Sequence, residues 1–241
     1  AATDNSEIWE IQAAEDAGSL ANLVFRTRAN NGTGGSEAMR IDNSGQVGIG
    51  TSDPTGIHSL AKVLEISGGD GGDLIIGNNV STNVGAGAHI GAIAFKNIDN
   101  STGSSPHYAG IRCESADTSG NMDLRFYTGI ANLEADTPQA MIDQNGNLLV
   151  GKTTIATGTA GIALRSNGEV RGTVDGAESA RFSRLSSDGN IVGFEKDGAS
   201  VGSIGVSGGN NLYISSSQSN HAGLTFATDS ILPTRQGATI D

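Results

Sequence analysis

The run 68-GGDGGDLII-76 has the residue types and spacing of a calcium-binding nonapeptide. The pattern G-G-x-G-x-D-x-U-x is filled at its fixed positions by Gly68, Gly69, Gly71, Asp73 and Ile75. In calcium-binding β-rolls the ion lies between successive copies, and no second copy follows, so the run supplies half a site. A Gly-rich hairpin loop between the strand candidates 64-LEIS-67 and 74-LIIG-77 is the simpler interpretation, with calcium held by oxygens of neighbouring chains as the alternative. We predict no metal site and no cofactor.

The acidic side chains also suggest glycoside cleavage as a candidate reaction, which needs two carboxyl groups about 5–9 Å apart. The candidates lie in polar segments: Asp99, Glu114, Asp117, Asp123, Glu134 and Asp136. Most are interpreted as solvated turn residues, and the chain has no long loop rich in Trp and Tyr for stacking on sugars. Cys113, the single cysteine, is interpreted as a small buried hydrophobe. The four histidines show no metal-ligand spacing. We therefore predict that the chain is not an enzyme.

One segment has the residue types of a receptor contact. The segment 104-SSPHYAG-110 joins two strand candidates and carries His107 and Tyr108, whose rings offer a stacking face and a polar tip to a sugar. An ordinary surface loop is the alternative, and 218-QSNHAG-223 is a second, weaker candidate.

Composition excludes several classes of partner. The 241 residues carry a net charge of -12, and the 14 basic residues are scattered, which disfavours nucleic acid. The sequence contains no run of 18 apolar residues, which is about the length needed to span a membrane. Gly contributes 36 residues and aromatic residues only 4%, so each local core will be thin. Completion of these cores by identical copies of the chain is the interpretation that we favour over a Gly-rich β protein that folds alone.

The elements expected are short strands and tight turns. The segments 38-AMRIDNSGQVGIGT-51 and 140-AMIDQNGNLLVGKT-153 predict two hairpins, since Asn and Gly tolerate the positive φ of such turns. Residues 8–27 are ambiguous between helix and strand, and we favour strands. The last third predicts a meander whose strands are ARFSRL (180–185), NIVGFEK (190–196), SVGSIGVS (200–207) and LYISSS (212–217).

Internal repetition indicates modules. Phe25 and Phe126 are separated by 101 residues, as are Asp42 and Asp143, and Phe226 lies in a third related segment. We predict modules at 1–55, 56–160 and 161–241, the first two closing in the hairpins.

These hairpins carry a family resemblance. The stretch AMRIDNSGQVGIGTSDP (38–54) resembles the junction motif of bacteriophage tail fibres, M-R-I-d-x-x-G-n-V-G-I-G-T-x-x-P, which closes each β-rich module. The match at 141–153 is looser, with Leu149-Val150-Gly151 in place of Val-Gly-Ile-Gly. Residues 200–217, 223–226 and 231–241 are similar to the segment that precedes the C-terminal end region of such fibres. In that family an autocleaved intramolecular chaperone domain often follows. The chain begins with Ala rather than Met, so we expect a processed chain or a piece of a longer one.

The resemblance implies an all-β, elongated homotrimeric fibre of the virion, extracellular, that contacts other tail or virion proteins and attaches to a host-surface glycan or protein. The residues expected at the trimer axis or junction are Met39, Ile41, Val47, Gly48, Ile49, Gly50, Met141, Leu149 and Val150. Glycines between apolar residues would let three chains approach closely. The alternatives are a polysaccharide-degrading tailspike-like hydrolase and a bacterial surface adhesin module.

Overall fold

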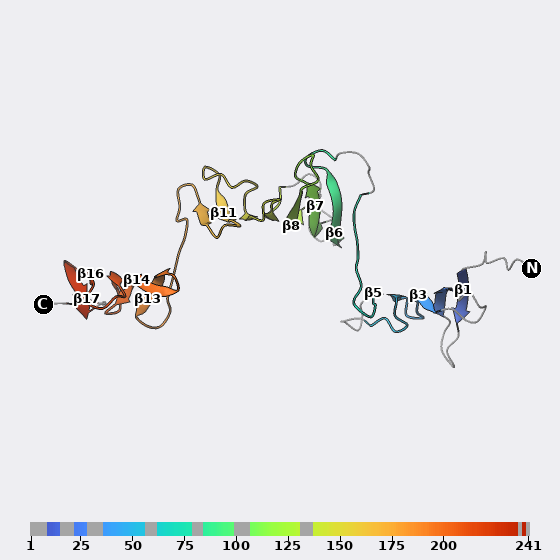
Figure 1. The fold of residues 1–241 in the computed structure, drawn as a ribbon, viewed down its shortest axis with the longest axis horizontal. Coiled ribbons are helices and arrows are strands. Elements are labelled where there is room, and N and C mark those ends of the chain that lie inside the picture. The colour runs from blue at the N-terminus through green and yellow to red at the C-terminus, as the bar shows by residue number, and fades with distance from the viewer. Residues whose placement is uncertain are drawn as a thin grey trace, which may run out of the picture. The chain divides into compact units, whose positions relative to one another are not determined.

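A computed structural model of the chain describes residues 9–14, 22–27, 36–55, 62–78, 84–98, 107–130, 137–235 and 238–239. Within these ranges every regular element is a strand, and the strands form three sheets (Figure 1). No helix in this part of the chain is long and apolar enough to cross a membrane. The predicted all-β class with short antiparallel strands is confirmed, with one parallel pair as an exception.

Sheet A has five strands in chain order, and each strand pairs with the next along the chain. They are β1 (Trp9–Ala14), β2 (Asn22–Thr27), β3 (Glu37–Ile41), β4 (Val47–Ile49) and β5 (Leu64–Ile66). The first four are antiparallel, whereas β4 and β5 are parallel. Residues 8–27 were ambiguous in sequence, and their described part is two paired strands, as favoured.

Sheet B has seven antiparallel strands, again in chain order. They are β6 (His89–Asn97), β7 (His107–Ser115), β8 (Met122–Ile130), β9 (Ala140–Ile142), β10 (Leu148–Val150), β11 (Gly161–Leu164) and β12 (Val170–Thr173). Three long strands are followed by four of three or four residues, so the sheet narrows along the chain (Figure 1).

Sheet C is a meander of six antiparallel strands. They are β13 (Gly189–Lys196), β14 (Ala199–Ser207), β15 (Asn211–Ser216), β16 (Ala222–Phe226), β17 (Ile231–Arg235) and β18 (Ala238–Thr239). Three of the four strands expected here are present, as β13, β14 and β15.

Both predicted hairpins form, and their hydrogen bonds repeat at the 101-residue offset. Ile41 pairs with Val47 as Ile142 pairs with Leu148. In the first turn Asp42 Oδ1 accepts the backbone N–H groups of Ser44 and Gln46, each at 2.8 Å. In the second turn Asp143 Oδ1 accepts those of Asn145 and Asn147, each at 2.9 Å. The glycine of each turn has a φ of 76–77°, which Gly adopts without strain.

Each turn is also tied to an earlier strand. The N–H of Asn43 donates to Asn22 Oδ1 at 2.9 Å, and the N–H of Gln144 donates to Asp123 Oδ1 at 2.9 Å. The turn between β11 and β12 continues the series, because the N–H of Ser166 donates to Asn147 Oδ1 at 3.1 Å. Polar side chains at strand ends therefore hold successive turns in register.

Several sequence predictions differ from the structure. The segments LIIG (74–77) and ARFSRL (180–185) are not strands, because nothing in the described chain pairs with them. His107 and Tyr108 begin β7 instead of lying in a loop, since they pair with Asn97 and Lys96 of β6. The sheets also end at residues other than the predicted module boundaries: β5 lies beyond residue 55, and β11 and β12 lie beyond residue 160. The module boundaries themselves stay a prediction.

We expect Asp143→Ala to lower the free energy of unfolding by about 1–2 kcal/mol, because two backbone donors lose a charged acceptor in a partly exposed turn. Denaturant unfolding at one fixed protein concentration measures this difference. Asp70→Ala is the control, since Asp70 is exposed and has no hydrogen bond in the described chain. Equal midpoints for the two variants would contradict a structural role for the Asp143 turn.

Candidate self-association surface

One face of sheet B is apolar across its seven strands. Residues at alternate positions of a strand share a face, and residues paired across strands share it too. Two cross-strand rows follow from the register, and their members other than Gly91 and Gly172 are Ile93, Ile111, Cys113, Leu124, Phe126, Ala140, Ile142, Leu148, Val150, Ile162, Leu164 and Val170. We call this set the apolar face of sheet B. It contains no charged side chain.

The apolar face is the uncovered side of sheet B. Leu124, Ile142, Val150 and Ile162 are 38–45% exposed, and no member of the set is buried. The opposite face of the same strands is the covered one: Met141, Leu149 and Ala163 form a cluster with 0–2% exposure. The sheet therefore turns its charge-free side outward, the reverse of what a soluble monomer normally does.

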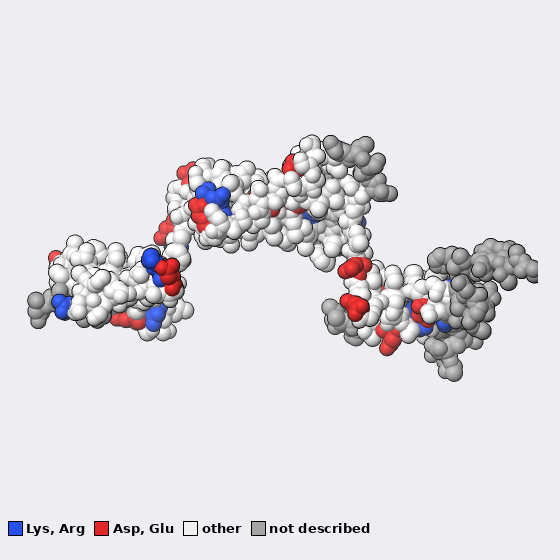
Figure 2. All heavy atoms as spheres, viewed as in Figure 1, with Lys and Arg blue, Asp and Glu red and all other residues white. Residues whose placement is uncertain are grey.

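Sheets A and C have the same arrangement. The apolar face of sheet A comprises Leu23, Phe25, Met39, Ile41, Val47, Ile49, Leu64 and Ile66. That of sheet C comprises Val192, Ile204, Val206, Leu212, Ile214, Leu224, Phe226, Ile231 and Pro233. Neither set has a buried member, whereas Val24 in sheet A and Thr234 in sheet C, on the opposite faces, are 0% exposed. Charged side chains gather in small groups in the space-filling view, and most of the surface seen there is uncharged (Figure 2).

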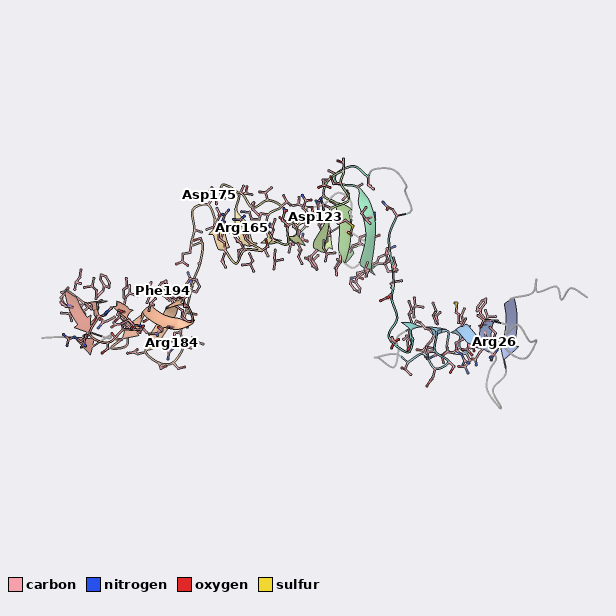
Figure 3. The ribbon with its side chains drawn as sticks, viewed as in Figure 1. Arg26, Asp123, Arg165, Asp175, Arg184 and Phe194 are labelled. Carbon is pink, nitrogen blue, oxygen red and sulfur yellow. The ribbon has the colours of Figure 1, made fainter. Side chains whose placement is uncertain are left out.

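Ion pairs occupy the covered face of sheet B. Glu114, 3% exposed, binds Arg112 of its own strand and Arg125 of β8, the latter at 2.5 Å. Arg125 also binds Asp123 at 3.3 Å. The Arg112 guanidinium lies 5.0 Å from the ring centre of Tyr127, a cation–π distance. Figure 3 labels Asp123 within this sheet. Each of these charged side chains lies beside one of opposite charge, and their attraction offsets part of the free-energy cost of removing the charges from water.

The candidate residues for an axis or junction divide between the two faces. Met39, Ile41, Val47 and Ile49 lie on the apolar face of sheet A, and Val150 lies on that of sheet B, where it is 42% exposed. Gly48, Met141 and Leu149 lie on the covered faces.

Met141 is the structural counterpart of Arg40, not of Met39. The register pairs Arg40 with Gly48 and Met141 with Leu149, and both pairs differ by 101 residues. The second hairpin lacks one residue between its Met and its Asp, and a shift of one residue moves a side chain to the other face.

The two glycines expected at the axis are explained by contacts inside the chain. A Cβ on Gly48 would lie 2.6 Å from the carbonyl oxygen of Thr51, which follows β4 and folds over it. A Cβ on Gly50 would lie 1.9 Å from the carbonyl oxygen of Ser67, and Gly50 has a φ of 75°. Both positions need glycine whether or not another chain is near.

The other candidate residues lie apart from the apolar faces or outside the described residues. The His107 side chain, Asp99, Glu134 and Asp136 lie outside them, and Tyr108 is half-buried at the start of β7. Asp117 accepts the N–H of Ser119 at 2.7 Å in a turn, and the side-chain amide of Asn121 holds the pKa of Asp117 below its usual value. Glu114 and Asp123 are occupied by arginines, as described above. Within the described ranges no three His, Cys, Asp or Glu side chains are placed to hold a metal ion.

Sequence reasoning missed most of the apolar faces. Leu124, Ile142, Leu148, Ile162 and Leu164 were not singled out, and Phe126 was noted only as a marker of the repeat. Each strand carries the available signal, an apolar residue at i and i+2, but the faces become visible only when the register aligns these pairs.

No protein-family model matches the chain, and no curated protein matches its sequence.

A second group of ion pairs lies at the turn between β11 and β12. Glu169 Oε1 lies 2.5 Å from Arg171 Nε, and Glu169 Oε2 lies 2.8 Å from Arg165 Nη1. Figure 3 labels Arg165 at this end of sheet B. Hydrogen bonds from Arg171 and then Arg165 hold the pKa of Glu169 at about 2, below its ordinary 4.5.

Because the Glu169 pKa is depressed by folding, the stabilisation from its ion pairs is fully present above about pH 4.5 and is lost as pH falls through about 2. NMR titration of selectively labelled glutamate carboxyl groups measures this directly. We expect Arg171→Gln to raise the Glu169 pKa more than Arg165→Gln, since Arg171 is the larger cause. Titration of Glu169 near 4.5 in the unmodified chain would show that these ion pairs do not persist in solution.

Gly50→Ala and Gly151→Ala form a matched pair at equivalent hairpin positions. Both have a φ of 70–75°, so both lose about 1–2 kcal/mol through left-handed backbone strain. Gly50→Ala should lose more, because its Cβ meets Ser67, whereas the nearest atom to a Cβ on Gly151 is 3.8 Å away. Unfolding free energies measure the difference, and equal losses would contradict the close approach of Ser67.

Proposed function

We propose that this chain is a structural and adhesive segment of a bacteriophage tail fibre, in which three copies associate through their apolar faces. The observation that carries the proposal is that all three sheets leave an apolar face uncovered. The number of copies and the biological setting rest on the resemblance of residues 38–54 to the junction hairpin of tail fibres.

Energetics supports association as the role of these faces. Full burial of one exposed Val, Leu, Ile or Phe side chain contributes about 1.5–3 kcal/mol to the free energy of folding or association. Each apolar face has several such side chains, and because they are already partly covered, each would contribute less than this. A small single-layer sheet has little other apolar area with which to offset the conformational entropy of its ordered residues. Association with identical copies supplies that area, since each copy brings the same apolar faces.

The matched 101-residue geometry of the two hairpins supports a modular chain within this proposal. Each hairpin continues an apolar face through its strands and fixes the register through its Asp turn. A fibre built this way has a mechanical role in addition to attachment to a host surface. Tyr108 and His107 stay the predicted contacts.

Ile162→Asp tests the proposal, because it places a charge in the apolar face of sheet B at a residue that is 45% exposed. The control is Ile155→Asp, since Ile155 is 36% exposed in the loop between β10 and β11 and its carbonyl accepts a hydrogen bond from Arg171 Nη1 on the covered side of the sheet. We expect Ile162→Asp to reduce the sedimentation coefficient, whereas Ile155→Asp leaves it unchanged.

Cys113 gives a second readout, because it is the only cysteine and lies on the same face. Burial raises the pKa of its thiol in the chain, so the comparison is made between variants at one pH. Its reaction with a small thiol reagent should be faster in Ile162→Asp than in the unmodified chain or in Ile155→Asp. Identical thiol rates and sedimentation in all three proteins would overturn the proposal.

A further inference from the structure

The segment Leu74–Ile76 has the sequence of a strand but no strand partner. Its three side chains are 64%, 91% and 46% exposed. Residues 72–78 make no hydrogen bond within the described part of the chain. The described part of one chain therefore leaves the backbone groups of this segment unpaired and most of the Leu74 and Ile75 side chains exposed.

Its pattern is that of the three-residue strands of this protein. These strands read apolar–x–apolar, and their outer residues lie on the apolar faces: β4 is VGI, β5 is LEI, β9 is AMI and β10 is LLV. The segment LII at 74–76 has the same pattern. As a strand it would present Leu74 and Ile76 on one face. Each of the four strands likewise contributes two apolar residues, at its first and third positions, to an apolar face.

An open edge suited to this segment exists on sheet A. β5 is the last strand of that sheet and pairs only with β4. Leu64 and Ile66 of β5 lie on the apolar face, and Glu65 lies on the opposite side, where its carboxylate accepts the N–H of Thr55 at 2.9 Å. The backbone groups of Leu64 and Ile66 at this edge make no hydrogen bond within the described residues, although Gly72 of the same chain lies against the Ile66 carbonyl oxygen. An apolar edge of this kind is a template for one more strand once the connection at Gly72 moves aside.

We propose that Leu74–Ile76 of one chain adds as a strand to the open edge of β5 in a second copy of the chain. Leu74 and Ile76 then extend the apolar face of sheet A, and Ile75 lies beside Glu65 whether the strands run parallel or antiparallel. The addition links neighbouring chains through backbone hydrogen bonds as well as apolar contacts. The inference rests on the proposed association of copies.

A disulfide tests it in the background Cys113→Ser, which removes the natural thiol. Paired residues on neighbouring strands approach closely enough for a disulfide. We expect Glu65→Cys/Ile75→Cys to give, after mild oxidation, covalently linked chains on a non-reducing denaturing gel. The control pair Glu65→Cys/Asp70→Cys should stay unlinked between chains, because Asp70 lies in the connection outside the added strand.

Linked bands absent from the test pair, or a linkage confined within single chains, would overturn the inference. The light-scattering mass of the same variant before oxidation distinguishes a failure of the proposed association from a failure of the strand addition. A mass of one chain means that the proposed association has failed. A mass of several chains without the 65–75 linkage means that only the strand addition is wrong.

Discussion

The alternation of side chains along a β-strand places a constraint on this protein that one chain does not satisfy. In a single-layer sheet, alternate residues point to opposite faces, and a folded chain normally covers the apolar one. Here the covered faces hold the ion pairs, glycines and small polar residues beside a few apolar side chains such as Val24, Met141 and Leu149, whereas most of the Leu, Ile, Val and Phe side chains of the strands lie on the uncovered faces. All three sheets place most of their apolar side chains on the uncovered face, so this arrangement is a general feature of the fold and does not arise from one irregular segment.

The turns serve the same constraint. A register error of one residue would move an entire apolar set to the opposite side. The Asp42 and Asp143 turns oppose such errors, because each carboxylate fixes two backbone donors and each turn donates to a side chain on an earlier strand. Strands of three residues have few ladder hydrogen bonds of their own. Their order therefore depends on side chains such as Asn22, Asp123 and Asn147.

Local features of the sequence were sufficient for most of the strands and for both hairpins, because Asp-x-x-Gly turns and alternating apolar residues act over a few positions. Non-local features were not predictable in the same way. The roles of Gly48 and Gly50 depend on Thr51 and Ser67, and the face of Met141 depends on a one-residue difference between the two hairpins. Leu74–Ile76 and residues 180–185 have strand-like sequences without a partner in the described chain, and pairing depends on the partner as much as on the segment.

The solution mass of the unmodified protein, measured by light scattering after size exclusion at several concentrations, tests most directly whether the apolar faces are covered by other copies. The account predicts a stable mass of three times the 24.4 kDa of one chain. A mass of one chain at every concentration, with the apolar faces still open to solvent, would contradict it.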